Sequence, residues 1–239
     1  MRHTPAAGRR AVVVDDEQAL AGLIGSYLER DGFDVTLCHH GGAAIDVLRD
    51  VDPDVVILDL GLPGIDGVEV CRQLRIFSDC YVVMLTARSE EVDTLIGLSV
   101  GADDYMTKPF SPRELMARVA VLMRRPRRAA SNGVVASAPA LEIGSLRLDV
   151  DGREAHVDGE LVPLTRTEFD LLAALAVRPG SVLSRRALID AVWGTGWVGD
   201  DHLVDVHVLH VRQKLGDTAQ EQRFVRTVRG VGYRIGTGS

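Results

Sequence analysis

Short apolar runs alternate with amphipathic segments through the first half of the chain. The runs are rich in β-branched residues, which is typical of strands buried on both faces of a sheet, and the segments between them repeat with a helical period. The expected strands lie near residues 11–15, 34–38, 54–58, 81–86 and 104–108, and the expected helices near residues 17–30, 42–49, 67–75, 90–99 and 112–124. This alternation predicts an α/β domain over residues 9–124, with a doubly wound five-stranded parallel sheet of flavodoxin-like type.

The pattern changes after residues 125–140, a polar, proline-containing stretch with a basic start that we interpret as an interdomain linker. Short strands with Asp-Gly turn signals follow, and then three helices and a hairpin, so a second domain is expected over residues 141–237. In this domain the expected strands lie within residues 141–163, the helices at 165–177, 184–193 and 201–215, and the hairpin strands at 223–228 and 232–235. A capping box is expected at Thr165–Glu168, before the first of these helices, and another at Ser111–Glu114, before the last helix of the first domain.

Composition indicates a globular protein of two modest domains. The chain has 239 residues, of which 46% are hydrophobic and 26% charged. No apolar run approaches the ~20 residues of a membrane span, and the first residues lack the apolar core of a signal peptide, so we expect a cytoplasmic protein with no membrane partner. The net charge is −7, so any nucleic-acid contact is expected at a local basic patch, such as residues 202–239.

Polar residues stand where the expected strands of the first half end. Asp15 and Asp16 close the first run, Asp59 closes the third, Thr86 the fourth and Lys108 the fifth. The carboxyl ends of parallel strands lie along one edge of the sheet, where open α/β folds bind ligands, so these side chains should converge. Any one of the carboxylates alone would be read as an ordinary solvated loop residue, but matching chemistry at four strand ends makes coincidence a remote alternative.

This convergence suits reversible phosphorylation of Asp59. Crowded carboxylates need a cation, and Mg²⁺ is the hard ion that accepts few protein ligands, here Asp15, Asp16, Asp59 and the backbone carbonyl of Gly61. The ammonium of Lys108 and the hydroxyl of Thr86 would then contact phosphoryl oxygens. Phosphatases that use a nucleophilic aspartate carry a second aspartate two positions later, where this chain has Gly61. We therefore expect the aspartyl phosphate at Asp59 to persist as a signal, and the protein not to be an enzyme. Phosphatase activity is the competing hypothesis.

The same residues resemble a known family. The segments Val14–Glu17, Leu58–Gly67, Leu85–Arg88 and Gly101–Phe110 resemble the receiver domain of two-component response regulators. The resemblance implies that Asp59 is the phosphoacceptor, that Asp15 and Asp16 are the metal-binding pair, that Thr86 and Tyr105 form a switch pair, and that the Lys108–Pro109 peptide bond is cis.

The second half resembles the winged helix-turn-helix domain of OmpR/PhoB response regulators. The residues that carry this resemblance are Leu164–Leu172, Val204–His207, Arg212–Leu215 and Thr227–Arg234. It implies a transcriptional regulator that a sensor histidine kinase phosphorylates, that pairs as a homodimer on tandem DNA half-sites and that contacts RNA polymerase. The alternative is an atypical regulator that binds DNA independently of phosphorylation.

The third helix of the second domain and the final hairpin supply the expected DNA contacts. Hydrophobic spacing assigns Leu203, Val204, Val208, Val211 and Leu215 to the core face of this helix. The remaining candidates for groove or phosphate contacts are Val206, His207, His210, Arg212 and Lys214, with Thr227 and Arg229 in the wing. His202, Leu203 and His210 stand where relatives carry other residues, so no relative's target sequence is carried over.

The resemblance also implies a dimer interface. Asp103, Asp104, Glu114, Arg118 and Arg125 match its pattern of intersubunit salt bridges. Thr94, however, stands where a basic partner for Glu114 is usual. Because an exposed ion pair contributes only ~0–1 kcal/mol, the dimer is expected to be weaker and not absent.

Overall fold

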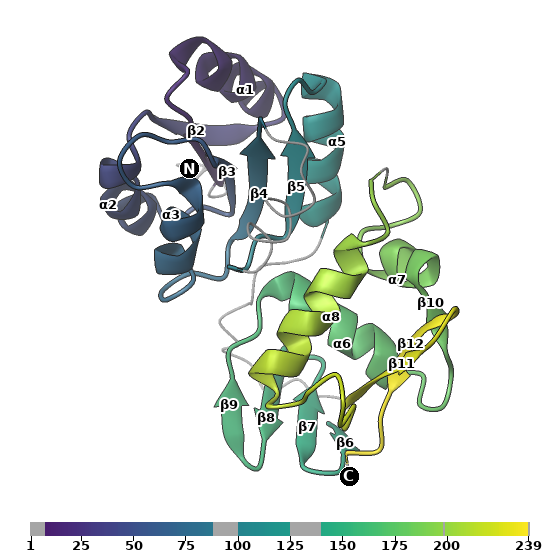
Figure 1. Ribbon diagram of the computed structural model, residues 1–239. Coiled ribbons are helices and arrows are strands. Elements are labelled where there is room, and N and C mark those ends of the chain that lie inside the picture. Colours follow the sequence, from purple (N-terminus) through teal and green to yellow (C-terminus); the bar gives the residue numbers. More distant parts are fainter. Residues whose placement is uncertain (1–7, 88–99, 125–139, 198, 239) are drawn as a thin grey trace, which may run out of the picture. The chain divides into compact units, whose positions relative to one another are not determined.

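The computed structural model describes residues 8–87, 100–124, 140–197 and 199–238. The chain divides into two compact units, residues 1–124 and residues 125–239 (Figure 1). The expected helix over 90–99, and all of the expected linker except residue 140, lie outside the described residues. Among the helices that are described, none is long and apolar enough to cross a membrane.

The first unit contains a five-stranded parallel sheet. Its strand order is β2-β1-β3-β4-β5, the flavodoxin-like order, so the predicted fold is confirmed. The strands are β1 Arg9–Val14, β2 Phe33–Cys38, β3 Val55–Asp59, β4 Tyr81–Thr86 and β5 Asp104–Thr107. Every residue of β3 and β4 is buried, because helices cover both faces of the sheet centre.

Helices lie on both faces of this sheet (Figure 1). They are α1 Gln18–Arg30, α2 Gly41–Val51, α3 Gly67–Leu74 and α5 Pro112–Leu122. The helices α1 and α5 contact each other on one face, and α2 and α3 contact each other on the opposite face. The capping box expected at the start of α5 is wrong: Ser111 makes no side-chain cap hydrogen bond, and the Glu114 carboxylate binds Arg118 instead.

The second unit begins with a four-stranded antiparallel sheet in the order β6-β7-β8-β9. Its strands are β6 Leu141–Ile143, β7 Leu146–Asp149, β8 Glu154–Val157 and β9 Glu160–Val162. The hairpin turns predicted from the two Asp-Gly pairs are confirmed. At the second turn Asp158 and Gly159 both have positive φ, 52° and 87°, which is the conformation that an Asp-Gly pair tolerates.

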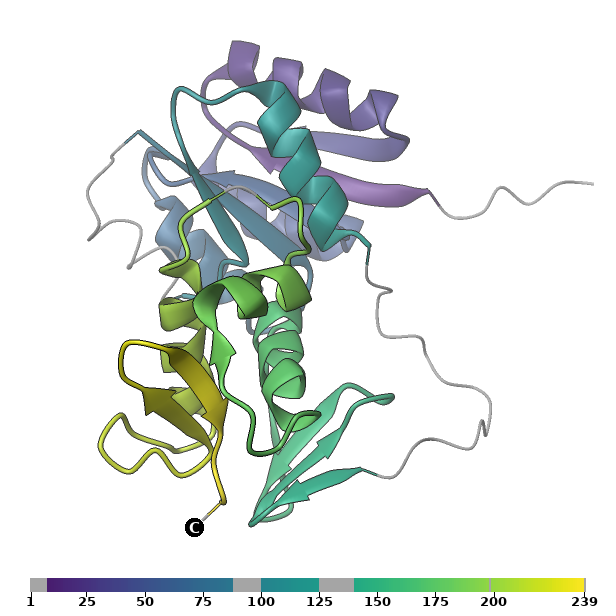
Figure 2. The ribbon, with the colours of Figure 1, turned by 90° about the vertical axis from the view of Figure 1, so that its right-hand side faces the viewer.

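Three helices and a second small sheet complete this unit (Figure 2). The helices are α6 Arg166–Ala176, α7 Arg185–Val192 and α8 Leu203–Lys214, and the strands are β10 Leu183–Ser184, β11 Val225–Val228 and β12 Gly232–Ile235. The capping box at Thr165 and Glu168 is confirmed at the start of α6. The pairing of β10 with β12 was not predicted, because two residues are too few to produce a pattern.

Candidate functional site

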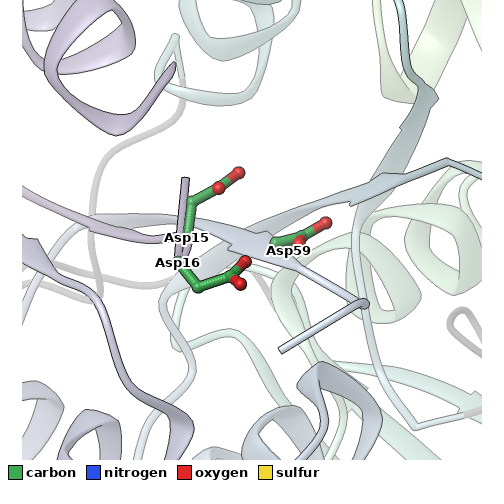
Figure 3. Close-up of side chains that lie close together, drawn as sticks. All are labelled: Asp15, Asp16 and Asp59. Atoms are coloured by element: carbon green, nitrogen blue, oxygen red, sulfur yellow. The ribbon is translucent and has the colours of Figure 1, made fainter. Parts of the chain in front are cut away.

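Three carboxylates meet at the carboxyl end of the parallel sheet (Figure 3). Asp15 and Asp16 follow β1, and Asp59 is the last residue of β3. Oxygen atoms of all three lie within 4.8 Å of one another. Asp15 is 0% exposed and Asp59 is 6% exposed, whereas Asp16 is open to solvent. The predicted convergence of these carboxylates is therefore present in the structure.

Lys108 brings a positive charge to the same place from the end of β5. Its Nζ lies 2.8 Å from Asp15 Oδ2 and 3.1 Å from Asp59 Oδ1. The backbone N–H of Lys108 donates to the carbonyl of Thr86 at 2.6 Å, and the Lys108–Pro109 peptide bond is cis, as the resemblance implied. The ammonium thus links β1 and β3 through two carboxylates.

The electrostatics of this cluster fit a divalent cation. Burial raises the pKa of Asp59 above its ordinary value, and the hydrogen bond and charge of Lys108 lower it only in part. Burial alone would lower the pKa of Lys108, but the hydrogen bonds and charges of Asp15 and Asp59 outweigh it, and the pKa is raised. One ammonium therefore faces three carboxylates, and a doubly charged ion with oxygen ligands matches the remaining negative charge.

The surroundings of Asp59 are shaped by close backbone contacts. The backbone of Gly61 donates a hydrogen bond to the Asp59 carboxylate, which lowers its pKa slightly. A Cβ on Gly67 would collide with the backbone carbonyl of Asp59, so only glycine lets α3 begin this close to β3. Thr86 is buried at the end of β4, and Tyr105 is half-buried on β5, paired in register with Met84.

The predicted DNA contacts on α8 require a correction. His207, His210 and Arg212 are 1%, 3% and 6% exposed, so the expectation that they project from the helix is wrong for this structure. The ring of His207 lies 5.4 Å from that of Trp193. Arg212 donates to the carbonyl of Val225 and to Thr227 Oγ1, both at 2.8 Å, and so joins α8 to the hairpin.

Lys214 and His210 face α6. Lys214 Nζ lies 2.6 Å from the carboxylate of Glu168, which is 1% exposed, and His210 Nδ1 lies 3.7 Å from it. Burial and the charge of His207 lower the pKa of His210 to about 4, so its ring is neutral at pH 7. Burial alone would raise the pKa of Glu168, but the charge and hydrogen bond of Lys214 lower it. These side chains hold α8 against α6.

The remaining DNA candidates differ in exposure. Val206 is 5% exposed, although it was expected on the reading face. Thr227 is half-buried on β11, and Arg229 is exposed in the turn between β11 and β12. Leu209 and Gln213 were not among the predicted DNA contacts, yet both are exposed on α8. A projection at 100° per residue places both opposite the core residues and would have identified them.

The four described residues of the expected dimer interface form ion pairs within the chain. Asp103 is 1% exposed and pairs with Arg75 at 2.8 Å. Arg118 pairs with both Asp104 at 3.0 Å and Glu114 at 2.9 Å. Asp103 is therefore an internal residue here, contrary to the expectation of an intersubunit bridge. Arg125 and Thr94 lie outside the described residues.

Comparison with known proteins gives consistent matches to both units. The response regulator receiver domain family matches residues 11–120, and the family described as "transcriptional regulatory protein, C terminal" matches residues 159–235. The DNA-binding response regulator MtrA of Mycolicibacterium smegmatis is 42% identical over 228 residues, which cover 95% of this chain and 97% of MtrA.

Two further matches extend over almost the whole chain. The alkaline phosphatase synthesis transcriptional regulatory protein PhoP of Bacillus subtilis is 40% identical over 231 residues, covering 95% of this chain and 96% of PhoP. Among solved structures, a mutant of RitR matches with a TM-score of 0.76 and 26% identity, covering 97% of this chain and 100% of that one.

Proposed function

The chain belongs to the two-component response regulators of OmpR/PhoB type, in which a receiver domain precedes a C-terminal DNA-binding domain, and we propose that phosphorylation of Asp59 controls its binding to DNA. The observation that carries the proposal is the position of the Asp59 carboxylate, which ends a buried strand beside Asp15, Asp16 and Lys108. Among the described residues, no other group of three or more acidic side chains has its oxygen atoms within 4.8 Å of one another.

In this proposal a sensor histidine kinase is the phosphoryl donor. An oxygen of the Asp59 carboxylate forms the new bond to phosphorus as the bond to the donor breaks. Asp15, Asp16, Asp59 and the carbonyl of Gly61 would hold Mg²⁺, which neutralises charge on the phosphoryl group during transfer. The ammonium of Lys108 would bind a phosphoryl oxygen. To do so it would either leave its ion pair with Asp15 or contact Asp15 and the phosphoryl group together.

The output is a change in DNA binding. Thr86 turns its hydroxyl toward the phosphoryl group and Tyr105 moves inward, which favours pairing of two copies on tandem half-sites and contact with RNA polymerase. Pairing through Asp104 and Glu114 requires exchange of the internal ion pairs of Arg118 for intermolecular ones. Because ion pairs within each copy are lost while similar ion pairs between the copies are gained, a weak dimer is expected.

A regulator that binds DNA without phosphorylation is the second candidate. The internal pairing of Arg118 favours it, because the dimer gains little when these ion pairs are exchanged for intermolecular ones. Selection of DNA by the full-length protein from a random pool, with and without a phosphoryl donor and Mg²⁺, distinguishes the two. We expect strong enrichment of a tandem repeat only with the donor. Equal enrichment in both arms supports the second candidate, and no enrichment in either contradicts DNA binding.

The Asp16→Ala variant is expected to lose the stabilisation by Mg²⁺ while remaining folded. Asp16 is exposed, and removing one of three clustered carboxylates relieves repulsion, so the variant without metal should melt at the same temperature as the wild type or higher. Thermal melting with and without Mg²⁺ measures this. The matched control is Asp34→Ala, an exposed aspartate on β2. A metal-induced shift as large in Asp16→Ala as in the wild type contradicts a metal role.

The Arg229→Ala variant is expected to bind DNA about tenfold more weakly, because a charge-assisted hydrogen bond contributes about 1.5 kcal/mol. The loss should be largest beside narrow A·T-rich minor grooves, where the negative potential is concentrated. A binding series on operators with altered flanks measures it, with Arg147→Ala, an exposed arginine of β7, as the control. An equal loss on every flank makes Arg229 a phosphate contact only, and no loss means that the wing does not touch DNA.

A further inference from the structure

The exposed side of α8 is a narrow stripe. At 100° per residue, His202, Leu209 and Gln213 fall on one side of the helix, and Val204, Val208 and Val211 fall on the opposite side. The first three are exposed and the last three are buried, as this projection requires. Leu209 is 47% exposed although it is apolar. Val206 projects near the same stripe, but its side chain is buried.

The cations of α8 lie away from this stripe. Arg212 is bound to the Val225 carbonyl and to Thr227 on the hairpin, and Lys214 is bound to Glu168 of α6. The bidentate contact of arginine or lysine with guanine is the commonest specific contact in the major groove. Neither cation of α8 is positioned to make it, because both serve contacts within the domain. The ring of His202, at the start of the stripe, lies 3.2 Å from the carboxylate of Asp205. The other side chains that the stripe offers for readout are an apolar group, Leu209, and an amide, Gln213.

We propose that Leu209 and Gln213 determine the DNA sequence that this protein selects, Leu209 by contacting the 5-methyl group of thymine and Gln213 by binding N6 and N7 of adenine. The inference rests on the proposed function, because it assumes that α8 enters the major groove. An aliphatic side chain recognises the thymine methyl, and a glutamine amide matches the donor and acceptor edge of adenine.

The spacing of the two residues supports a joint contact. Four residues along a helix advance about 6 Å, and successive bases on a strand are separated by about 3.4 Å. Leu209 and Gln213 can therefore reach bases on neighbouring or next-neighbouring pairs. A single exposed leucine is common on protein surfaces. Leu209 is distinguished by an exposed glutamine, Gln213, one turn further along the same side of α8.

The test uses the full-length protein and the operator that it selects from a random pool. Each thymine is replaced in turn by deoxyuridine, which lacks the methyl group, and each adenine by 7-deazaadenine, which lacks N7. Affinities are measured for the wild type, Leu209→Ala and Gln213→Ala. Leu161→Ala is the matched control, because Leu161 is a 56% exposed leucine on β9 of the same unit. Both test positions are exposed, and thermal melting of each variant verifies that it is folded.

We expect one deoxyuridine position to weaken wild-type binding about fourfold, as loss of one buried methyl predicts, and to leave Leu209→Ala binding unchanged. We expect one 7-deazaadenine position to weaken wild-type binding about tenfold and to leave Gln213→Ala unchanged. Leu161→Ala should respond to both analogues as the wild type does. If the analogues affect the wild type and the helix variants equally, or affect none, the inference is overturned while DNA binding stands. If the wild type selects no DNA, the proposed function itself fails.

Discussion

The Asp59→Asn variant is expected to accept no phosphoryl group from acetyl phosphate or from a phosphorylated histidine kinase in the presence of Mg²⁺. An amide is too weak a nucleophile to attack phosphorus and removes one of the three carboxylates of the cluster. Incorporation of labelled phosphate measures this, and the loss should be complete. Asp34→Asn, which alters an exposed aspartate of β2, should be labelled like the wild type.

The fold of Asp59→Asn is expected to survive at neutral pH. Burial raises the pKa of Asp59, so this group stabilises the folded state at low pH and that contribution is lost as the pH rises through the raised pKa. Asparagine carries no charge to desolvate, and the variant should therefore melt at least as high as the wild type at pH 7. Equal labelling of the folded variant and the wild type contradicts the assignment of Asp59 as the phosphoacceptor.

The Asp103→Ala variant is expected to destabilise the first unit by about 3–5 kcal/mol, the usual cost of removing one partner of a buried ion pair. The Asp103 carboxylate accepts hydrogen bonds from Arg75 and from the backbone N–H of Val82, both at 2.8 Å. The same arginine also donates to the backbone carbonyls of Gly101 and Cys80. Removal of Asp103 therefore leaves a largely buried guanidinium and a buried N–H without this carboxylate.

Urea denaturation of the full chain measures the effect of Asp103→Ala. Far-UV circular dichroism follows both units, and tryptophan fluorescence reports the second unit alone, because both tryptophans, Trp193 and Trp197, lie there. The circular dichroism transition of the first unit should move to lower urea while the fluorescence transition stays. Unchanged stability together with loss of dimerisation indicates the intersubunit role that the sequence resemblance implied.

The strands and the acidic site of the first unit followed from the sequence because topology alone places them. Runs such as Val55–Leu58 are apolar throughout since both faces of the sheet are covered, and a polar residue that ends such a run must lie at the carboxyl edge. Asp15, Asp59 and Lys108 therefore meet without any information about side-chain packing. The helix over 90–99 stays a prediction.

The prediction of which α8 side chains contact DNA was wrong in part, because a polar side chain was assumed to be exposed. His207 packs on Trp193, and Arg212 supplies hydrogen bonds to a hairpin that is distant in sequence. Buried polar side chains with tertiary partners cannot be distinguished from exposed ones by periodicity. Leu209 was assigned neither to the core face nor to the DNA contacts, although a helical projection places it opposite the core residues.

The dependence of operator affinity on a phosphoryl donor tests the central claim most directly. Fluorescence anisotropy titrations of the selected operator compare the wild type and Asp59→Asn, each with and without acetyl phosphate and Mg²⁺. We expect the donor to tighten wild-type binding by about five- to 150-fold, the usual range of coupling between two sites, and to leave binding by Asp59→Asn unchanged. Equally tight binding by both proteins, with or without the donor, would contradict control by Asp59.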